Sequence, residues 1–416
     1  MIVELGYGKE KVSVNIPDDN VQAVLKPNKV EMGSTGIAEV KRAILNPIGS
    51  NRLKDVVSEG ERVCIITSDI TRPMPTKLVL PVVVGELNEG GIADQDITVV
   101  FALGNHRAHT EDEKKYLAGD AYSRVRCIDT DQTKVVRLGT TSFGTPVDVF
   151  QEVARADRVI CLGNIEYHYF AGYSGGAKAI MPGVSTTAAI QLNHSKMVED
   201  TSAAGRIEGN NVRTDIDEVA RFVNIDFIVN VVLNEEKQII KAVAGDYIKA
   251  HREGCAFLDK LYKIRIEKKA DIVLVSPGGY PKDINLYQAQ KALDNAKHAV
   301  QDGGIVILVA SSKEGLGEKV FERWMMEAKS PSDMVEKIQK QFELGGHKAA
   351  AIGMVQKKAD VYLVSDMDAD FVRSMFFKPF AAMQDALNSA LRIKGNEASV
   401  LVMPYGGSTL PVEYRK

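Results

Sequence analysis

Cysteine is scarce in this chain: its 416 residues include four, Cys64, Cys127, Cys161 and Cys255, and no two of them form a CxxC pair. That scarcity excludes a zinc ribbon and a thioredoxin-like redox motif, both of which need closely spaced cysteines. Cys64 and Cys161 lie in apolar, strand-like runs, where we expect buried thiols that serve only in packing. A chain of this length can bury a large core, so folding requires neither disulfides nor metal ions.

An excess of charge is also missing, since 52 lysines and arginines oppose 55 acidic residues and leave a net charge of −3. This balance argues against a nucleic-acid-binding protein. The chain has no run of 18 apolar residues, so we expect no membrane-spanning helix. The first residues show no basic segment followed by an apolar one, and we therefore expect no signal peptide and a cytoplasmic protein. The GxSxG, HExxH and GxGxxG motifs of serine hydrolases, zincins and classical dinucleotide-binding proteins are absent as well.

What the sequence does contain is a series of short runs rich in Val, Ile and Leu that alternate with helix-like segments. Apolar runs of this length are typical of strands buried on both faces of a parallel sheet, and the alternation predicts an α/β architecture. The predicted strands cover residues 62–67, 96–103, 158–162, 271–276, 304–310, 360–365 and 399–403. The predicted helices cover residues 110–117, 185–198 (capped by Ser185), 250–262, 287–300 and, on either side of Pro331, parts of 322–342. Residues 2–14 read as a hairpin.

A charged stretch at residues 264–270 separates a helix-like segment from the next predicted strand. We place a domain boundary there, with one α/β domain over residues 1–265 and a second over residues 271–400. Residues 401–416 would form a tail that packs back on the first domain. The sequence therefore predicts two α/β domains with mainly parallel sheets and an active-site cleft between them.

Ligands of open parallel sheets bind beyond the carboxyl ends of the strands, so the loops that follow the predicted strands are the places to search. The first loop carries Asp69 and Arg72, with two prolines. Arg72 could hold a carboxylate or phosphate through two parallel hydrogen bonds, although a solvated surface ion pair is the alternative. The next loop carries His106 and His109, whose imidazoles suit general acid–base catalysis near neutral pH. The same spacing would suit a metal pair or a simple capping loop with exposed imidazoles.

Residues 163–183 form the most unusual stretch, because five glycines fall within these 21 residues and a single lysine, Lys178, follows a Ser-Gly-Gly turn. Glycines let backbone N–H groups approach a phosphate, and the turn consists of Ser174, Gly175 and Gly176. The lysine is flanked by two alanines, so the stretch is not a Walker A loop. The alternative is a glycine-rich surface loop.

Four of the seven histidines lie in two neighbouring loop-rich stretches: His106, His109, His168 and His194. The others, His251, His298 and His347, are expected to be exposed. His194 lies on a predicted helix and would, alone, be an ordinary helix histidine. In the second domain, Gln288 and Lys291 are three positions apart and share one face near the start of a predicted helix. That face could line a cleft or be solvated.

Together these segments resemble the lactate racemase family, the nickel-pincer enzymes. The resemblance is carried by DITRPMP at residues 69–75, GNHRAHT at 104–110, YHYFAGYSGGAKAIMPGVS at 167–185, NHSKM at 193–197 and GGYPKDINLYQAQKAL at 278–293. The segments occur in the family's order and extend over a little more than half of the chain. The Gly-Lys segment is highly specific, whereas the HRxxT piece would be weak alone.

The resemblance implies a nickel-containing cofactor, a pyridinium mononucleotide with sulfur groups that is joined to Lys178 through a thioamide. Three donors of nickel belong to the cofactor, so no cysteine cluster is needed, and His194 would be the fourth ligand, which suits planar Ni(II). His106 and His168 match the two acid–base histidines of the family. The residues that contact the substrate in the family are matched by Arg72, Gln288 and Lys291. Contacts to the cofactor are expected from Asp69, Ser174, Gly175 and Gly176. The family gives no role for His109.

The activity implied is the racemisation of a 2-hydroxy acid, with lactate as the default substrate. Hydride leaves Cα for the cofactor while one histidine takes the hydroxyl proton, and hydride then returns to the other face of the 2-keto acid. Two bases are needed because the two faces lie on opposite sides of the carbon. Cofactor-synthesis enzymes would be required partners. The alternatives are malate, a longer 2-hydroxy acid or a sugar acid as substrate, a non-catalytic phosphate-binding protein, and a zinc-dependent lyase or hydrolase.

Overall fold

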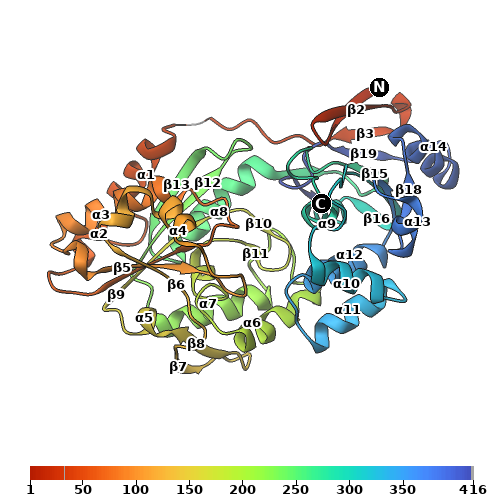
Figure 1. Cartoon of the computed structure of the whole chain (residues 1–416). Coiled ribbons are helices and arrows are strands. Elements are labelled where there is room, and N and C mark those ends of the chain that lie inside the picture. Colours follow the sequence, from red (N-terminus) through yellow and green to blue (C-terminus); the bar gives the residue numbers. More distant parts are fainter. Residues whose placement is uncertain (32, 414–416) are drawn as a thin grey trace. The chain divides into compact units, whose positions relative to one another are not determined.

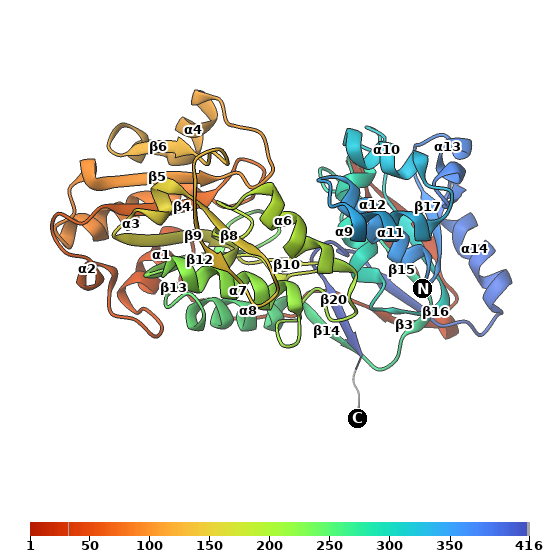
Figure 2. The same ribbon diagram turned by 90° about the horizontal axis from the view of Figure 1, so that it is seen from below.

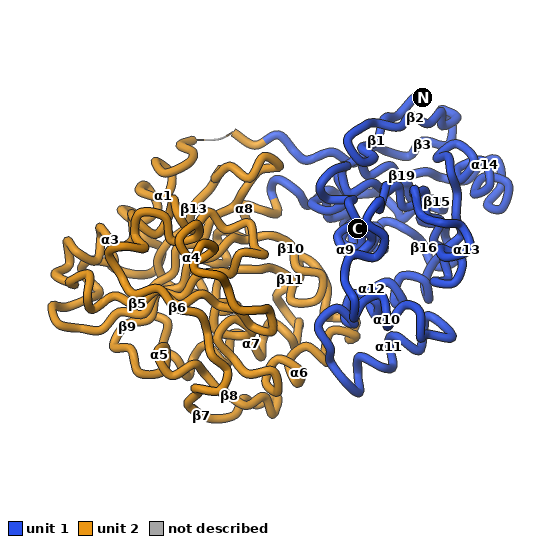
Figure 3. The backbone as a smooth tube through the Cα atoms, in the orientation of Figure 1, with its two compact units in different colours: residues 1–29, 260–416 blue, residues 30–259 orange. Residues whose placement is uncertain are grey.

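The computed structural model describes residues 1–31 and 33–413, which form two compact units (Figure 3). Unit 1 comprises residues 1–29 together with the chain from residue 260 onward, and unit 2 comprises residues 30–259. The chain leaves unit 2 near residue 259, a few positions before the predicted boundary. The first 29 residues differ from the prediction, because they belong with the C-terminal half of the chain and not with the residues that follow them.

The sheet of unit 2 has six strands in the order β13-β12-β9-β4-β5-β6 (Figure 1). Its pairings are parallel apart from the antiparallel edge strand β13. The strands are β4 (Val63–Ser68), β5 (Ile97–Ala102), β6 (Arg126–Asp129), β9 (Arg158–Asn164), β12 (Phe227–Leu233) and β13 (Ile239–Gly245). The predicted α/β class with mainly parallel sheets is confirmed, because continuous apolar runs such as β4 are buried along almost their whole length.

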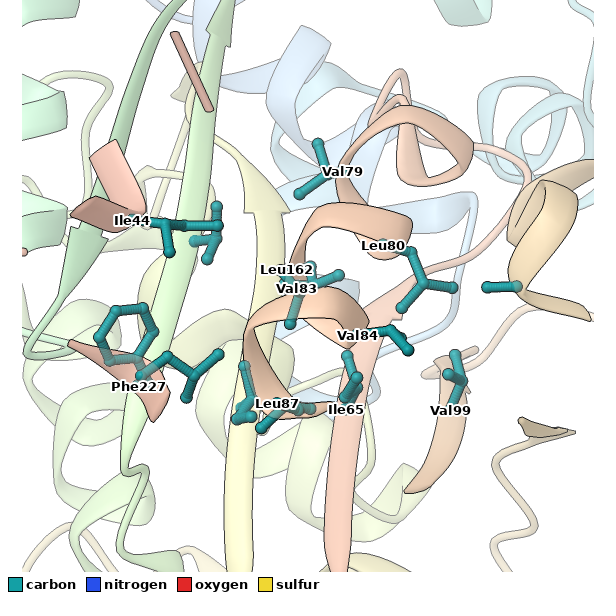
Figure 4. Packing of buried hydrophobic residues seen from close by; sticks show 14 of the residues in the cluster. Ile44, Ile65, Val79, Leu80, Val83, Val84, Leu87, Val99, Leu162 and Phe227 are labelled. Atoms are coloured by element: carbon teal, nitrogen blue, oxygen red, sulfur yellow. The ribbon is translucent and has the colours of Figure 1, made fainter. Parts of the chain in front are cut away.

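Helix α3 (Thr76–Glu89) covers part of this sheet with an apolar stripe. Val79, Val83 and Leu87 recur at helical spacing and pack in one core cluster with strand residues that include Ile65 and Leu162 (Figure 4). Burying each such side chain contributes about 1.5–3 kcal/mol, which makes the sheet a rigid base for the loops at its edge. The other helices of unit 2 are α1 (Gly36–Leu45), α2 (Leu53–Val56), α4 (Glu111–Ala118), α5 (Gln151–Ala154), α6 (Thr187–His194), α7 (Asn211–Val223) and most of α8 (Lys249–Tyr262).

Two helix starts test the sequence rules for caps. Helix α4 begins as predicted, because Thr110 and Glu113 form a capping box. Helix α6 begins two residues later than predicted and is capped by Thr186, whose side chain accepts the N–H of Ala189. Ser185, the predicted cap, instead donates its hydroxyl to the carbonyl of Ile180. Unit 2 also holds two small antiparallel pairs, β7 (Val135–Thr140) with β8 (Pro146–Phe150) and β10 (Tyr167–His168) with β11 (Gly172–Tyr173).

Unit 1 contains a second six-stranded sheet, with parallel pairing throughout, in the order β18-β17-β16-β15-β19-β3. Its strands are β3 (Val21–Val24), β15 (Ala270–Val275), β16 (Val300–Val309), β17 (Asp360–Val364), β18 (Lys378–Phe380) and β19 (Val400–Met403). Residues 401–413 of the predicted tail belong to unit 1, because they continue β19 and then form β20 (Leu410–Glu413), which pairs with β14 (Lys263–Ile266); residues 414–416 lie outside the described residues.

Both faces of this sheet are covered. The predicted hairpin, β1 (Ile2–Tyr7) with β2 (Glu10–Asn15), shares a core cluster with the sheet and with α14 (Met383–Lys394). Figure 2 shows α9 to α12 on the other side of the sheet. These helices are α9 (Leu286–Ala296), α10 (Lys319–Glu327), α11 (Pro331–Lys340) and α12 (Gly346–Gln356), and α13 (Ala369–Ser374) follows β17. Within residues 1–31 and 33–413, no helix has the length and apolar character needed to cross a membrane.

Candidate active site

The loops that follow the adjacent strands β4 and β5 bring Asp69 and His106 together. His106 Nδ1–H donates to Asp69 Oδ2 at 2.7 Å, and the Thr71 N–H donates to Asp69 Oδ1 at 2.6 Å. Burial would raise the pKa of Asp69, yet the hydrogen bonds from His106 and Thr71 lower it to about 2. The carboxylate therefore stays ionised, and it fixes the tautomer of His106 in which Nε2 is the basic nitrogen.

The sequence assigns Asp69 to cofactor binding, whereas both of its carboxylate oxygens bond to protein groups. His109, for which the sequence gives no role, ties the same loops together. Its Nδ1 lies 2.6 Å from Asp129 Oδ1 at the end of β6, and its Nε2 accepts the N–H of Ile70 at 3.0 Å. With both ring nitrogens bonded and a side chain only 1% exposed, His109 holds the backbone beside Asp69 in place.

His168 is held in the short hairpin of β10 and β11. Its Nδ1 accepts the N–H of Ala171 at 3.3 Å, and its ring meets the edge of Phe170 with centroids 4.5 Å apart. Burial lowers the pKa of His168 well below its ordinary value, and a protonated Lys178 or His194 nearby would lower it further. A protonated His168 would carry hydrogens on both nitrogens and would lose the contact with Ala171. The neutral imidazole is therefore the stable form.

Lys178 lies in a short 3-10 turn over Gly176–Ala179. Burial, and next the positive charges of Arg213 and Arg72, lower the pKa of this amine well below its ordinary value. A deprotonated amine has a lone pair and can act as a nucleophile toward a carbonyl or thioacid carbon. The local environment of Lys178 thus suits covalent attachment of another group.

Phe170 was not identified from the sequence, yet it lies at the centre of the predicted residues. Its ring centre lies 4.5 Å from that of His168 and 4.9 Å from that of His194, and the Nζ of Lys178 lies 5.8 Å above it. Phe170 is 2% exposed. Because Phe170 has no polar atom, a search for chemically active side chains passes over it. The aromatic run from Tyr167 to Phe170 was the available signal.

The glycine-rich turn is built differently from a phosphate cradle. The Gly176 N–H donates to Asn230 Oδ1 at 2.7 Å, and the Ser174 hydroxyl donates to the Asn164 carbonyl at 2.8 Å. Both donors are engaged within the protein here, and their assignment to cofactor binding stays a prediction. Gly175 and Gly176 have φ values of 74° and 57°, which shape the turn that carries Lys178.

Two buried side chains from later helices hold the carbonyl groups of this turn. Arg213 of α7 donates to the carbonyls of Ala171, at 3.1 Å, and of Tyr173. His251 of α8 lies 2.8 Å, through Nε2, from the Ser174 carbonyl. Both side chains are almost fully buried, so the expectation of an exposed His251 is wrong. Neither contact is visible in the sequence, because the partners lie some 40 to 80 positions away along the chain.

The remaining predicted residues occupy three places. His194 ends α6, and its Nδ1 lies 2.9 Å from Asn193 Oδ1. Arg72 is exposed in the loop after β4, and its charge contributes to the lowered pKa values of both His168 and Lys178. Gln288 and Lys291 lie in unit 1, where both are exposed near the start of α9, as their spacing predicts.

The chain is similar to known proteins along most of its length. Residues 7–205 match the model of the lactate racemase N-terminal domain, and residues 266–410 match that of the lactate racemase C-terminal domain. The chain is 33% identical to a lactate racemase from Thermoanaerobacterium thermosaccharolyticum, over 98% of each chain. It is 30% identical to a lactate racemase from Lactiplantibacillus plantarum, over 97% of this chain and 98% of the relative.

Comparison with solved structures also points to the lactate racemases. The structure of the lactate racemase apoprotein from Thermoanaerobacterium thermosaccharolyticum superposes with a TM-score of 0.90 at 32% identity, over 99% of this chain and all of the other. A Thermotoga maritima protein shares the fold, with a TM-score of 0.66 at 18% identity over 92% of this chain. Because the similarity runs through both units, including the loops that hold Asp69, His106 and Lys178, this chain belongs to the lactate racemase family.

Proposed function

We propose that the protein racemises a 2-hydroxy acid, with lactate as the default substrate. The observation that carries this proposal is the grouping around Phe170 of two histidines and a lysine whose pKa is lowered, together with an Asp-His pair in the loops after β4 and β5. The two lactate racemases that align over nearly the whole chain support the same activity. The assignment makes the protein an isomerase.

We infer that the cofactor is a nickel-pincer nucleotide attached to Lys178, and the protein's own donors fit such a group. Across the described ranges 1–31 and 33–413, no group of three or more His, Cys, Asp or Glu side chains is arranged to hold a metal. A lone imidazole such as His194 therefore suits a metal whose other donors come with the cofactor. The lowered pKa of Lys178 favours the deprotonated amine that the covalent bond requires. When bound, the cofactor supplies reversible acceptance of a hydride.

Proton transfer is assigned to His106 and His168. His106 Nε2 would take the proton of the substrate hydroxyl, because Asp69 holds the other ring nitrogen and stabilises the imidazolium that forms. His168 would serve the second enantiomer, and its lowered pKa keeps it in the neutral form that accepts a proton. Two histidines on separate loops meet the requirement of a racemase for two proton-transfer groups.

Substrate binding is assigned to Arg72, Gln288 and Lys291. The guanidinium of Arg72 can hold a carboxylate through two hydrogen bonds, which orients the acid while its carbon changes configuration. Gly175 would contribute to cofactor binding by shaping the turn that carries Lys178. The same assignments would serve malate, a longer 2-hydroxy acid or a sugar acid, since all of these share the carboxylate and hydroxyl that the assigned residues would bind.

The proposal is tested on protein produced together with cofactor-synthesis enzymes, the partners that the active form needs. Intact-protein mass and metal analysis should show an adduct on Lys178 and nickel. A panel of single-enantiomer 2-hydroxy acids is then followed by chiral chromatography, and lactate is expected to racemise. If lactate stays optically pure while another acid racemises, the default substrate is wrong. Activity in protein without any adduct would overturn the assigned cofactor.

A further inference from the structure

His194 has a polar partner that the family assignment does not mention. Its Nδ1 lies 2.9 Å from Oδ1 of the preceding residue, Asn193, and both residues are buried. Consecutive side chains on a helix ordinarily point away from each other, so this contact is not a consequence of helical geometry. It forms at the last residue of α6, where the chain passes into a 3-10 turn.

The orientation of the Asn193 amide is determined by its other partners. Its Nδ2 donates to the Val212 carbonyl at 3.2 Å and to Asp215 Oδ2 at 2.9 Å. A flipped amide would place its oxygen against these two acceptors, so the oxygen must face His194. Because an amide oxygen can only accept, His194 Nδ1 carries the hydrogen. The lone pair of the neutral imidazole is then on Nε2.

Asp215 is itself held by several donors. The hydroxyl of Thr141 donates to Oδ1 and that of Thr145 to Oδ2, each at 2.7 Å, and Lys196 Nζ lies 3.2 Å from Oδ2. Asn193 and Asp215 are each 0% exposed. The two threonines come from the turn between β7 and β8, so the carboxylate is anchored by elements outside α6. The result is a fixed chain of hydrogen bonds from Asp215 through Asn193 to His194.

We propose that Asn193, held by Asp215, is a positioning residue that keeps His194 in the tautomer whose Nε2 can bind a metal. A metal needs the nitrogen lone pair, and partners of the second ring nitrogen commonly change metal affinity or activity about 10–100-fold. The edge-on contact with Phe170 restricts the ring plane at the same time. The inference rests on the proposed function, since that function makes His194 the nickel ligand.

The first test uses the apoprotein and is independent of nickel. Long-range 1H–15N correlation spectra report which nitrogen of each histidine carries hydrogen, and a His194→Gln variant assigns the signal. Protein expressed alone should show His194 with hydrogen on Nδ1. In Asn193→Ala the signal should shift toward the other tautomer. A wild-type signal with hydrogen on Nε2 would overturn the inference and leave the proposed function untouched.

The second test measures nickel. Wild type, Asn193→Ala and Asn20→Ala are each made with the cofactor-synthesis enzymes and dialysed against a chelator. Asn20 is the matched control, because it is also a buried asparagine that donates to backbone carbonyls, those of Asn396 and Ala398, but it lies in unit 1. We expect the ratio of nickel to Lys178 adduct to fall about tenfold or more in Asn193→Ala only. Equal ratios in all three proteins would overturn the inference.

A paired substitution covers the case in which Asn193→Ala does not fold. The double variant Asn193→Asp with Asp215→Asn keeps the net charge and still gives His194 an oxygen acceptor. It should retain the wild-type nickel ratio, and a folded double variant that loses nickel would contradict the proposal. Wild-type protein with neither adduct nor nickel would instead mean that the proposed cofactor is wrong, so the two failures are distinguishable.

Discussion

Asp69 and His106 follow two strand residues that face each other, Ser68 of β4 and Ala102 of β5, and the His106 imidazole lies 2.7 Å from the carboxylate. The parallel register of the two strands brings the start of each loop to the same edge of the sheet. The pair is therefore a direct consequence of strand pairing and requires little adjustment of the loops.

Asp69→Asn should distinguish a role of Asp69 in holding His106 from a role in binding the cofactor. An asparagine keeps the size of the side chain but removes the charge that stabilises the His106 imidazolium, so we expect kcat to fall about 10²–10⁴-fold. The Lys178 adduct and the nickel content should not change. A double variant that also carries His106→Gln should be no slower than His106→Gln alone, because both changes remove the same step. Loss of the adduct in Asp69→Asn would mean instead that Asp69 binds the cofactor.

The lowered pKa of Asp69 also makes a prediction about stability in acid. A carboxyl whose pKa is lowered by folding stabilises the protein above its unfolded value, near 3.9, and this contribution is lost as the pH falls toward about 2. The melting temperatures of wild type and Asp69→Asn should therefore be compared between pH 6 and pH 2.5. The difference between them should narrow below pH 4. A difference in melting temperature that stays constant with pH would show that the carboxylate charge contributes nothing to stability.

His168 should also make the wild type less stable as the pH falls, because it is a base whose pKa folding lowers. Below about pH 6.5 the unfolded chain binds a proton at His168 that the folded protein does not, so the wild type loses stability as the pH falls. His168→Asn removes this proton-linked loss. The difference in unfolding free energy between variant and wild type should shift in favour of the variant between pH 8 and pH 5. At pH 8 the His168 imidazole is neutral in both the folded and the unfolded state. The difference in unfolding free energy at that pH therefore measures packing alone.

Lys178 should be unusually reactive in protein made without cofactor. Its pKa is lowered, so a larger fraction of the amine is deprotonated at neutral pH than in an exposed lysine such as Lys77. Brief treatment with a small acylating reagent at pH 7, followed by peptide mass mapping, should modify Lys178 well before Lys77. Protein that carries the cofactor should be protected at Lys178, and equal labelling of both lysines would contradict the prediction.

Gly176→Ala should destabilise the turn beneath Lys178. A Cβ at this position would lie 2.9 Å from the His251 ring, and the φ of 57° disfavours any residue with a side chain. We expect a loss of about 1–3 kcal/mol in unfolding free energy, together with a lower yield of adduct. Gly85→Ala is the control: it lies within α3 with open space around it, so alanine should stabilise by about 0.5–1 kcal/mol.

The sequence predicts some parts of this structure well because the signals are local. The run over residues 62–67 is apolar throughout, so β4 was identified along with the loop that carries Asp69. Thr110 and Glu113 likewise encode the start of α4 within four residues. The site residues that were missed, Phe170 and Arg213, act through packing and through carbonyl groups, and neither leaves a pattern in neighbouring positions.

Long-range pairing explains the remaining errors. Residues 1–29 were assigned to the wrong half because β3 joins its sheet through β19, near the other end of the chain. Nothing in the composition of β3 identifies that partner. The burial of His251 is similar, since it depends on the Ser174 carbonyl, 77 positions earlier. Both cases show tertiary contacts overriding what local sequence indicates.

The pairing of β3 with β19 also has a consequence for synthesis on the ribosome. Val21 is synthesised 379 positions before its partner Val400. Unit 2 is one uninterrupted segment and can fold as soon as residue 259 has emerged, because domains generally fold as units during translation. The edge strand β3 must wait, unpaired, until β19 has been made. Unit 2 can therefore fold before the second sheet closes.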